Sequence, residues 1–251
     1  MTSLSGAALF ARFAFPPNSL GYCGPADSGL LRELVPAGDG LSEEWRRVIT
    51  AFDGAWPYLE LIGNSLDRDP LESEVVEAYW LGTPLLEKID LLTLGISIED
   101  RFQARAGWDW EMVANALNSG GRPSHSFHVF CIYPWAGLLR SGVVTQSLQV
   151  LDRCRIRWGV VVGRAGDRLL VKSRTLAWDG QALALAPEQI ESALPPVDDD
   201  EVGDGDVVAL HWDYVCQRLT PGQQRNLMRD HSRHLSMMNE AGRRLAARIE
   251  S

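Results

Sequence analysis

Four cysteines and five histidines are the side chains of this sequence with the clearest capacity for nucleophilic or metal chemistry. The cysteines lie far apart and form no C-x-x-C pair, the spacing found in zinc ribbons and dithiol redox sites. Cysteines without such a framework are typical of proteins kept in a reducing compartment. We therefore expect four separate free thiols, at Cys23, Cys131, Cys154 and Cys216.

Two short segments place a thiol and an imidazole at the ends of strand-like runs. Cys154 precedes the alternating run 156–162, and His211 ends the run 206–211. A thiolate and an imidazole are both ligands of transition metals, so the pair could hold a metal ion. A closed barrel would bring the two strand ends together. The alternative is a small buried cysteine and a hydrogen-bonded histidine at a strand end.

A second group of possible ligands occurs in the string His125-Ser-Phe-His128-Val-Phe-Cys131, at spacings of three. On a helix these three side chains fall within about a third of the circumference. A metal site here needs a fourth ligand from elsewhere in the chain. Because the surrounding run is strongly apolar, the alternative is that the histidines are buried and hydrogen-bonded to backbone carbonyls. We expect Tyr133-Pro134-Trp135 to end this segment.

The string Tyr22-Cys23-Gly24-Pro25 predicts a loop that leads into a helix. An exposed cysteine at a helix entry is expected to have a lowered pKa, which makes Cys23 a candidate nucleophile in combination with a histidine and an acid from elsewhere. The structural alternative is a simple turn at Gly24-Pro25.

The remaining cysteine and histidines are predicted to be mainly structural. Cys216 follows His211 by five residues and Asp213 by three, so we expect it on the first turn after that strand, with Asp213 as a further possible ligand. His231 and His234 share the apolar face of the predicted last helix, at the edge of a core. The sequence contains no Gly-rich phosphate loop, HExxH, GxSxG or dinucleotide fingerprint, which disfavours nucleotide-dependent and hydrolase chemistry.

The elements that must position these residues are mainly helical over residues 5–140, because apolar positions recur there at spacings of three and four. Start and stop signals divide this part into short helices. We expect helices over 41–56 ending at Pro57, from Asp69-Pro70 to Gly82, from Pro84, from Ile98, from Trp110, and over 143–153.

From residue 156 the apolar spacing changes to two, which is typical of strands. Tight turns at 164–167 and 178–181 make 156–186 a predicted three-stranded meander. The acidic stretch 195–201 is expected to be a solvated loop. A strand over 206–211 and a capping box at Thr220-Pro221-Gly222-Gln223 then lead into a final helix.

Taken in order, these C-terminal features resemble the HypC/HupF family of NiFe-hydrogenase maturation chaperones, which are small OB-like barrels with a C-terminal helix. The resemblance covers roughly residues 150–240. The family's motif cysteine, with the glycine and valine after it, and its Gly-Asp-x-Val-x-x-His segment correspond here to Cys154, Gly159 and Val160 and to Gly205, Asp206, Val208 and His211.

This resemblance implies that Cys154 binds iron or a partner protein, and that His211 is a second ligand or the base that keeps the thiol deprotonated. The whole chain also resembles an uncharacterised actinobacterial family associated with hydrogenase gene clusters. That second resemblance is carried by the strings 15–25 (Phe-Pro-Pro-Asn-Ser-Leu-Gly-Tyr-Cys-Gly-Pro) and 133–135 (Tyr-Pro-Trp).

The composition fits a globular chain with a sizeable core, because 45% of its 251 residues are hydrophobic. Its 33 acidic against 24 basic side chains give a formal net charge of −9, which disfavours binding to nucleic acid or to an anionic membrane. The N-terminus lacks a basic leader segment, so we expect a cytoplasmic protein. The predicted class is α+β, with a helical domain over 1–150 and an OB-like β-barrel with a C-terminal helix over 151–251.

The sequence thus predicts an accessory or maturation chaperone for a NiFe-hydrogenase, which docks the large subunit or other maturation factors. No permanent cofactor is expected, only transient iron carrying CO and CN ligands. The alternative, from another class, is a small-molecule enzyme that uses Cys23 or the His125/His128 region in a pocket between the two domains.

Overall fold

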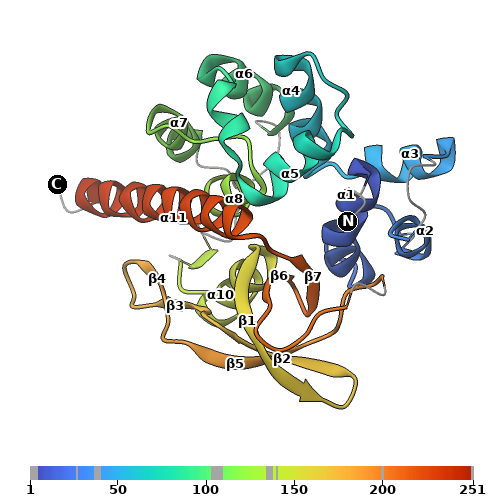
Figure 1. The fold of residues 1–251 in the computed structure, drawn as a ribbon. Helices are drawn as coiled ribbons and strands as arrows, with labels where there is room; N and C mark the ends of the chain where they lie inside the picture. Colours follow the sequence, from blue (N-terminus) through green and yellow to red (C-terminus); the bar gives the residue numbers. More distant parts are fainter. Residues whose placement is uncertain are drawn as a thin grey trace.

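Helices packed against an antiparallel sheet make up the protein, which confirms the α+β class (Figure 1). The computed structural model describes residues 5–26, 28–36, 41–102, 110–133, 138–139, 141–198 and 201–249. The helices before the sheet are α1 (Gly6–Ser19), α2 (Ser28–Leu34), α3 (Glu43–Thr50), α4 (Trp56–Leu66), α5 (Ser73–Leu81), η1 (Pro84–Lys88), α6 (Leu91–Phe102), α7 (Trp110–Asn118), α8 (His125–Phe127), η2 (His128–Ile132) and α10 (Val144–Cys154).

The main sheet has five strands in the spatial order β5-β2-β1-β6-β7, and every neighbouring pair is antiparallel. Strand pairing among the described residues does not close it into a barrel, but one parallel bridge between Leu194 and Tyr214 links its two edges. The strands are β1 (Arg157–Ala165), β2 (Arg168–Ser173), β5 (Gln189–Ala193), β6 (Val207–His211) and β7 (Tyr214–Arg218).

The predicted meander over 156–186 is correct for its first two strands and wrong for its third. β3 (Leu176–Trp178) does not join β2 but pairs with β4 (Leu183–Leu185) in a separate two-stranded sheet. The Leu176 amide donates to the Asp152 carboxylate at 2.7 Å, and the Asn239 side chain bonds both the amide and the carbonyl of Leu183, each at 2.8 Å. These contacts attach the small hairpin to α10 and to the last helix.

Two predicted helix boundaries are wrong because a second local signal was stronger. The apolar stripe over 41–56 forms two helices, since α3 ends at Thr50 and a new helix, α4, begins at Trp56. Pro57 lies in the first turn of α4, where a backbone N–H has no partner within the helix and its absence costs no hydrogen bond. Helix α6 begins at Leu91 instead of Ile98, because the Asp90 carboxylate accepts the Thr93 amide at 2.9 Å and caps the helix there.

Helix α5 also begins later than predicted and ends where predicted. The segment 69–72 forms a turn of its own, in which the Asp69 carboxylate accepts the Leu71 amide and the Glu72 carboxylate accepts the Asp69 amide. The helix therefore starts at Ser73. It ends at Gly82, whose φ of 67° is the left-handed conformation that favours glycine.

The last helix, α11 (Pro221–Ile249), begins at the predicted capping box. The Gln223 amide donates to the Thr220 hydroxyl at 3.2 Å, and the Thr220 amide donates back to the Gln223 side chain at 2.9 Å. Its predicted apolar face is confirmed, since His231 and His234 are both buried. Figure 1 shows this helix crossing between the helical layer and the sheet, so it contacts both.

A continuous cluster of buried side chains joins the two predicted domains, because it includes residues from α1 through to α11. The predicted boundary near residue 150 falls inside α10. Part of the acidic stretch predicted to be solvated is instead attached to this core, since Asp198 forms an ion pair with the buried Arg12 of α1. None of the helices among the described residues is long and apolar enough to cross a membrane.

Candidate metal site

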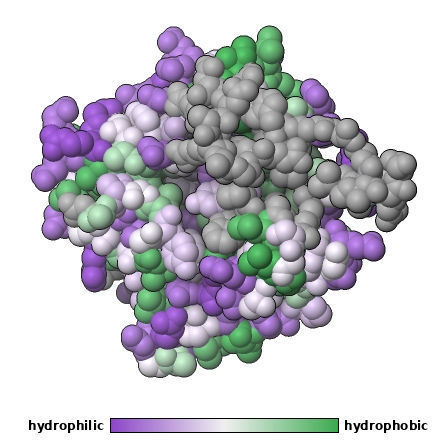
Figure 2. Space-filling model, turned by 180° about the vertical axis from the view of Figure 1, so that it is seen from behind, coloured by the Kyte–Doolittle hydropathy of each residue, from purple (hydrophilic) through white to green (hydrophobic). Residues whose placement is uncertain are grey.

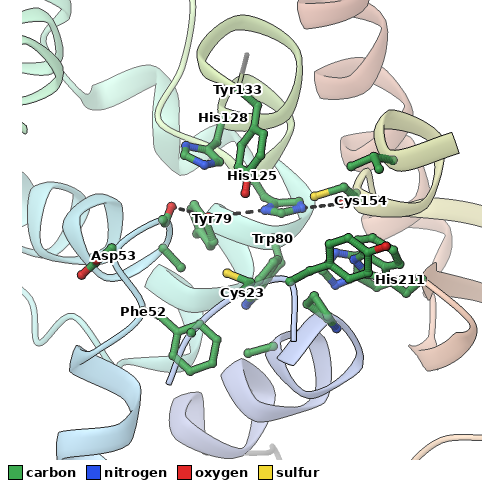
Figure 3. A pocket seen from close by; sticks show the side chains of 18 of the residues that line it. Cys23, Phe52, Asp53, Tyr79, Trp80, His125, His128, Tyr133, Cys154 and His211 are labelled. Carbon is green, nitrogen blue, oxygen red and sulfur yellow. Dashed lines mark hydrogen bonds between the residues drawn. The ribbon is translucent and has the colours of Figure 1, made fainter. Parts of the chain in front are cut away.

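A cavity of about 550 Å³ lies between α1, the helices α5 and α8, the end of α10 and the end of β6 (Figure 3). Aromatic rings form much of its wall. Both sequence strings that carry the whole-chain resemblance contribute to the cavity wall, the first through Pro17 and residues 21–24 and the second through Tyr133. Its thiols and imidazoles are those of Cys23, His125, His128, Cys154 and His211.

Three of these side chains form a group that could hold a metal ion. One ligand atom from each of His125, Cys154 and His211 lies within 4.8 Å of the others. We call these residues the His–Cys–His group. The sequence predicted Cys154 and His211 as one pair of ligands, and His125 with His128 and Cys131 as a separate group. The structure brings the first pair together and adds His125 to it, on three separate elements.

Backbone hydrogen bonds define which ring nitrogen of each histidine is available. Nε2 of His125 lies 2.7 Å from the Cys154 carbonyl oxygen, and Nδ1 of His211 lies 2.6 Å from the Phe13 carbonyl oxygen. A carbonyl only accepts, so these two nitrogens carry the protons. The lone pairs are therefore on Nδ1 of His125 and Nε2 of His211. This is the second-shell arrangement that orients imidazoles toward a metal.

The two free lone pairs have different surroundings. Nε2 of His211 has no hydrogen-bond partner among the described residues, and water cannot replace one easily because the residue is only 1% exposed. Nδ1 of His125 lies 3.4 Å from the Tyr79 hydroxyl, which is also 3.3 Å from the Gly54 carbonyl and can donate its proton there. Nε2 of His211 can thus bind a ligand without losing a hydrogen bond, whereas Nδ1 of His125 faces the Tyr79 hydroxyl, on the other side of its ring from the Cys154 carbonyl (Figure 3).

Cys154 stands at the junction between α10 and β1, and not at the start of a strand as predicted. It is the last residue of α10, and β1 begins three residues later. The turn after His211 is bonded to this junction, because the Trp212 amide donates to the Arg153 carbonyl at 2.9 Å and the Arg157 guanidinium donates to the Trp212 carbonyl at 2.7 Å. These bonds hold the end of β6 beside Cys154.

A buried polar cluster fixes the start of α8, and with it His125. The Ser124 hydroxyl donates to the Asp230 carboxylate at 2.6 Å and accepts the Phe127 amide at 3.2 Å as the helix cap. The same carboxylate lies 3.6 Å from Nδ1 of His234. Asp230 belongs to α11, so the last helix positions the residue that precedes the first histidine of the site.

Burial keeps both imidazoles of the group neutral and its thiol protonated at neutral pH. The loss of solvent lowers the pKa of His125 to about 4. It also lowers the pKa of His211 well below its ordinary value, and the neighbouring His125 adds to that effect. Burial raises the pKa of the Cys154 thiol, and the nearby Cys23 raises it further. Neutral imidazoles are the form that binds metals, whereas the thiol must lose its proton on binding.

The Cys23 loop forms the outer edge of the cavity, and its predicted pKa shift has the wrong sign. Burial and the Asp53 carboxylate raise the pKa of the Cys23 thiol to about 11, although the Gly24 amide bonds its sulfur and opposes the shift. The effect of desolvation on the pKa of Cys23 is therefore larger than the lowering expected from its position before a helix. The Asn18 side chain donates to the Cys23 and Pro25 carbonyls at 2.7 and 2.6 Å, which fixes the loop.

The other predicted candidates lie outside the His–Cys–His group. His128 lines the cavity, with Nδ1 3.2 Å from the Tyr58 hydroxyl, and Cys131 is buried away from the cavity on the π-helical segment η2. Cys216 lies within β7 and not on a turn after the strand, because the β6–β7 turn is short and ends before Tyr214. Asp213 lies in that turn and pairs with Arg153.

Several residues of the site carry no signal in the sequence. Tyr79 and Trp80 belong to the apolar stripe of α5 and are indistinguishable from core residues by spacing. Asp53 lies in a short connection between α3 and α4. Only the fold shows that the Trp80 ring lies against His125, with 4.8 Å between ring centroids.

The arrangement is a mixed set of nitrogen and sulfur atoms beside an aromatic cavity, in which both histidines are buried and Cys154 is half-buried. Three protein ligands and an adjoining space are the pattern of an open transition-metal site, in which the fourth position takes an external ligand.

The chain belongs to a family of unknown function, DUF6390, whose model matches residues 2–245. No curated protein and no solved structure gave a match.

Proposed function

We propose that this chain is a metal-handling accessory protein, which holds a transition-metal ion or a small metal fragment in transit on Cys154, His125 and His211. The single observation that carries this function is the His–Cys–His group itself, with its ligand atoms within 4.8 Å of one another. Nε2 of His211 is buried and has no hydrogen-bond partner among the described residues, and a cation held together with the thiol and the second imidazole would give this nitrogen a partner.

The ligand types favour a borderline or soft metal. Thiolate sulfur and imidazole nitrogen suit zinc, copper and iron, whereas magnesium and calcium require oxygen ligands. When Cys154 loses its proton, the group carries one negative charge, because both histidines are neutral. A cargo with a total charge of +1, such as iron(II) that carries one anionic ligand, would leave the site neutral, whereas a bare divalent ion would leave it with one positive charge.

The hydrogenase pathway is the specific form of this proposal. The resemblance to the HypC/HupF chaperones rests on Cys154 and His211, and these two residues are neighbours in the structure although 57 positions separate them in the sequence. The proposal also includes an OB-like fold for the C-terminal part of the chain. The five-stranded sheet, with one bridge between its two edges, supports it.

Docking of the hydrogenase large subunit or another maturation factor belongs to the same proposal. Exposed apolar side chains on the coloured part of the face in Figure 2 form small groups among hydrophilic ones. That face therefore offers no preferred docking surface in its described part. The cavity is the more specific feature, and we expect a partner to approach its mouth, where the exposed Tyr22 ring stacks on Trp212 with 4.0 Å between centroids.

A small-molecule enzyme is the second candidate, favoured by the volume of the aromatic cavity. A cysteine nucleophile needs a low pKa or an adjacent base. Burial raises the pKa of both cavity thiols, that of Cys23 to about 11, so neither is activated at neutral pH. Metal handling therefore accounts for more of the site than nucleophilic catalysis does.

The deciding experiment is anaerobic purification of the tagged chain from its native host, with iron and nickel quantified and CO and CN stretches sought by infrared spectroscopy. We expect stoichiometric metal, and hydrogenase large subunit or maturation factors in the eluate. The variants Cys154→Ser and His211→Asn should lose the metal, whereas Cys131→Ser, a buried cysteine outside the cavity, should retain it. Metal that persists in Cys154→Ser at wild-type stoichiometry would refute the proposed site.

A further inference from the structure

The loop that carries Cys23 brings a second thiol to the cavity, between solvent and the His–Cys–His group. Residues 19–22, which lead into Cys23, are exposed, and the Cys23 side chain itself lines the cavity (Figure 3). The two histidines of the inner group are buried, with His125 at 6% and His211 at 1% exposure. Cys23 therefore lies on the path from solvent to the inner ligands.

Three contacts hold the Cys23 sulfur in this position. The Asn18 side chain binds the loop carbonyls, and the Gly24 amide bonds the sulfur. Gly24 has a φ of 81°, and a Cβ there would lie 2.3 Å from the Phe52 ring, so the loop lies tightly on the cavity wall. An amide that bonds sulfur stabilises a thiolate, free or metal-bound, more than a neutral thiol.

Asp53 adds a negative charge beside this thiol. It lines the cavity, and its carboxylate is close enough to Cys23 to disfavour the thiolate. The repulsion that a carboxylate exerts on a free thiolate becomes an attraction for a cation bound to it. Cys23 and Asp53, which we call the rim pair, thus form a favourable first contact for a positively charged metal species.

Cys23 is not itself part of the inner group, because only the atoms of His125, Cys154 and His211 lie within 4.8 Å of one another among the described residues. It nevertheless lines the same cavity as Cys154. A thiol near a ligand group but outside it can exchange a metal with that group without being a permanent ligand.

We propose that Cys23, assisted by Asp53, is the entry ligand of the site, which takes the metal from an incoming thiolate complex and passes it to Cys154, His125 and His211. This inference rests on the proposed metal-handling function and adds the route and the class of donor, a metal held by thiolate ligands. In the first step the bond between the metal and the donor sulfur breaks and a bond to the Cys23 sulfur forms. The thiol proton leaves with the donor sulfur.

The second step repeats this exchange inside the cavity. The Cys154 sulfur and the imidazole lone pairs bind the metal, its bond to Cys23 breaks, and the Cys154 proton returns to the Cys23 sulfur. No electron changes hands, so neither an oxidant nor a reductant is required. The buried and unpartnered Nε2 of His211, at the inner end of the cavity, is the second observation that points to a ligand there.

Metal loading kinetics test the order of these steps. Co²⁺ is offered to the full chain either alone or as its glutathione complex, and the sulfur-to-cobalt charge-transfer band is followed by stopped flow. From the glutathione complex, Cys23→Ser should load about tenfold more slowly than wild type, yet reach the same final stoichiometry. Cys131→Ser is the matched cysteine control and should load at the wild-type rate.

The carboxylate is tested in the same assay. Asp53→Asn should slow loading at low ionic strength, and the difference from wild type should vanish at high salt, because screening removes the attraction. Glu33→Gln, an exposed carboxylate that does not line the cavity, is its control. Circular dichroism and thermal unfolding of each variant, together with Cys23→Ala as a second substitution, separate a loading defect from misfolding.

The outcomes are distinguishable. Equal loading rates in wild type and Cys23→Ser would overturn the entry role and leave the inner site standing. Loss of stoichiometric binding in Cys23→Ser would also overturn it, because Cys23 would then be a permanent ligand. A wild-type protein that binds no Co²⁺ would refute the proposed function, and the entry role with it.

Discussion

Acid destabilisation of the metal-free protein follows directly from the buried His125. The folded protein holds this imidazole neutral, with a pKa of about 4, whereas the unfolded chain has the ordinary value of 6.5. As the pH falls below 6.5, the unfolded chain therefore takes up a proton that the folded protein does not. The free energy of unfolding decreases with falling pH across this interval, and the loss ends near pH 4.

The size of the effect follows from the two pKa values. Between pH 7.5 and pH 5, one histidine with this shift lowers the free energy of unfolding by about 2 kcal/mol, an order-of-magnitude figure from proton linkage. His211 and His231 are buried with pKa values lowered in the same direction, so each adds to the loss. The wild-type protein should therefore become markedly less stable at pH 5.

Urea unfolding at several pH values, with a chelator present, measures this dependence. His125→Gln removes one titrating group, so its stability should fall by about 2 kcal/mol less than that of wild type between pH 7.5 and pH 5. Tyr79→Phe removes the hydroxyl that contacts Nδ1 and keeps the imidazole, so it should retain the wild-type pH dependence. Identical pH dependence in His125→Gln and wild type would refute the assignment of a neutral, buried His125.

Three shorter predictions concern the loop and the cluster behind the site. Gly24→Ala should lower the free energy of unfolding by about 2 kcal/mol, because Gly24 has a φ of 81° and an added Cβ would overlap the Phe52 ring. An unchanged urea midpoint would contradict this. Asp230→Ala removes the acceptor of the buried Ser124 hydroxyl and should lower the free energy of unfolding by about 1–3 kcal/mol. In thermal melts the double variant with Ser124→Ala should lose less stability than the sum of the two single variants. Alkylation of Cys23 by iodoacetamide should accelerate up to about pH 11, and a plateau near pH 8 would show an ordinary thiol.

Local signals predicted those parts of the fold in which a few neighbouring residues decide the conformation. The capping box at Thr220 and the hairpin turn before β2 depend on contacts within four residues, and both form as expected. The third strand of the meander was wrong because its pairing depends on Asp152 and Asn239, which lie 24 and 56 residues from their partners. Alternation of apolar residues also gave no indication that Arg157 is buried at 1% exposure.

The candidate site shows the same limit. Residue type selected Cys154, His211 and His125, since thiols and imidazoles are few in this chain. Spacing grouped His125 with Cys131, but the change from α8 to the π-helical η2 leaves Cys131 outside the cavity. The pKa of Cys23 was predicted in the wrong direction because the burial of its loop depends on Phe52, which is 29 residues away in the sequence.

Burial gives the site two properties that oppose each other until a metal arrives. It holds His125 and His211 neutral, so no proton has to leave either ring before a metal binds. It also keeps the Cys154 thiol protonated, so binding must release one proton and affinity should rise about tenfold per pH unit while that thiol is protonated. A donor thiolate that accepts this proton removes the cost of releasing it to water. The same low polarity that makes Cys154 inert as a nucleophile therefore makes it selective for metal delivered by thiolate exchange.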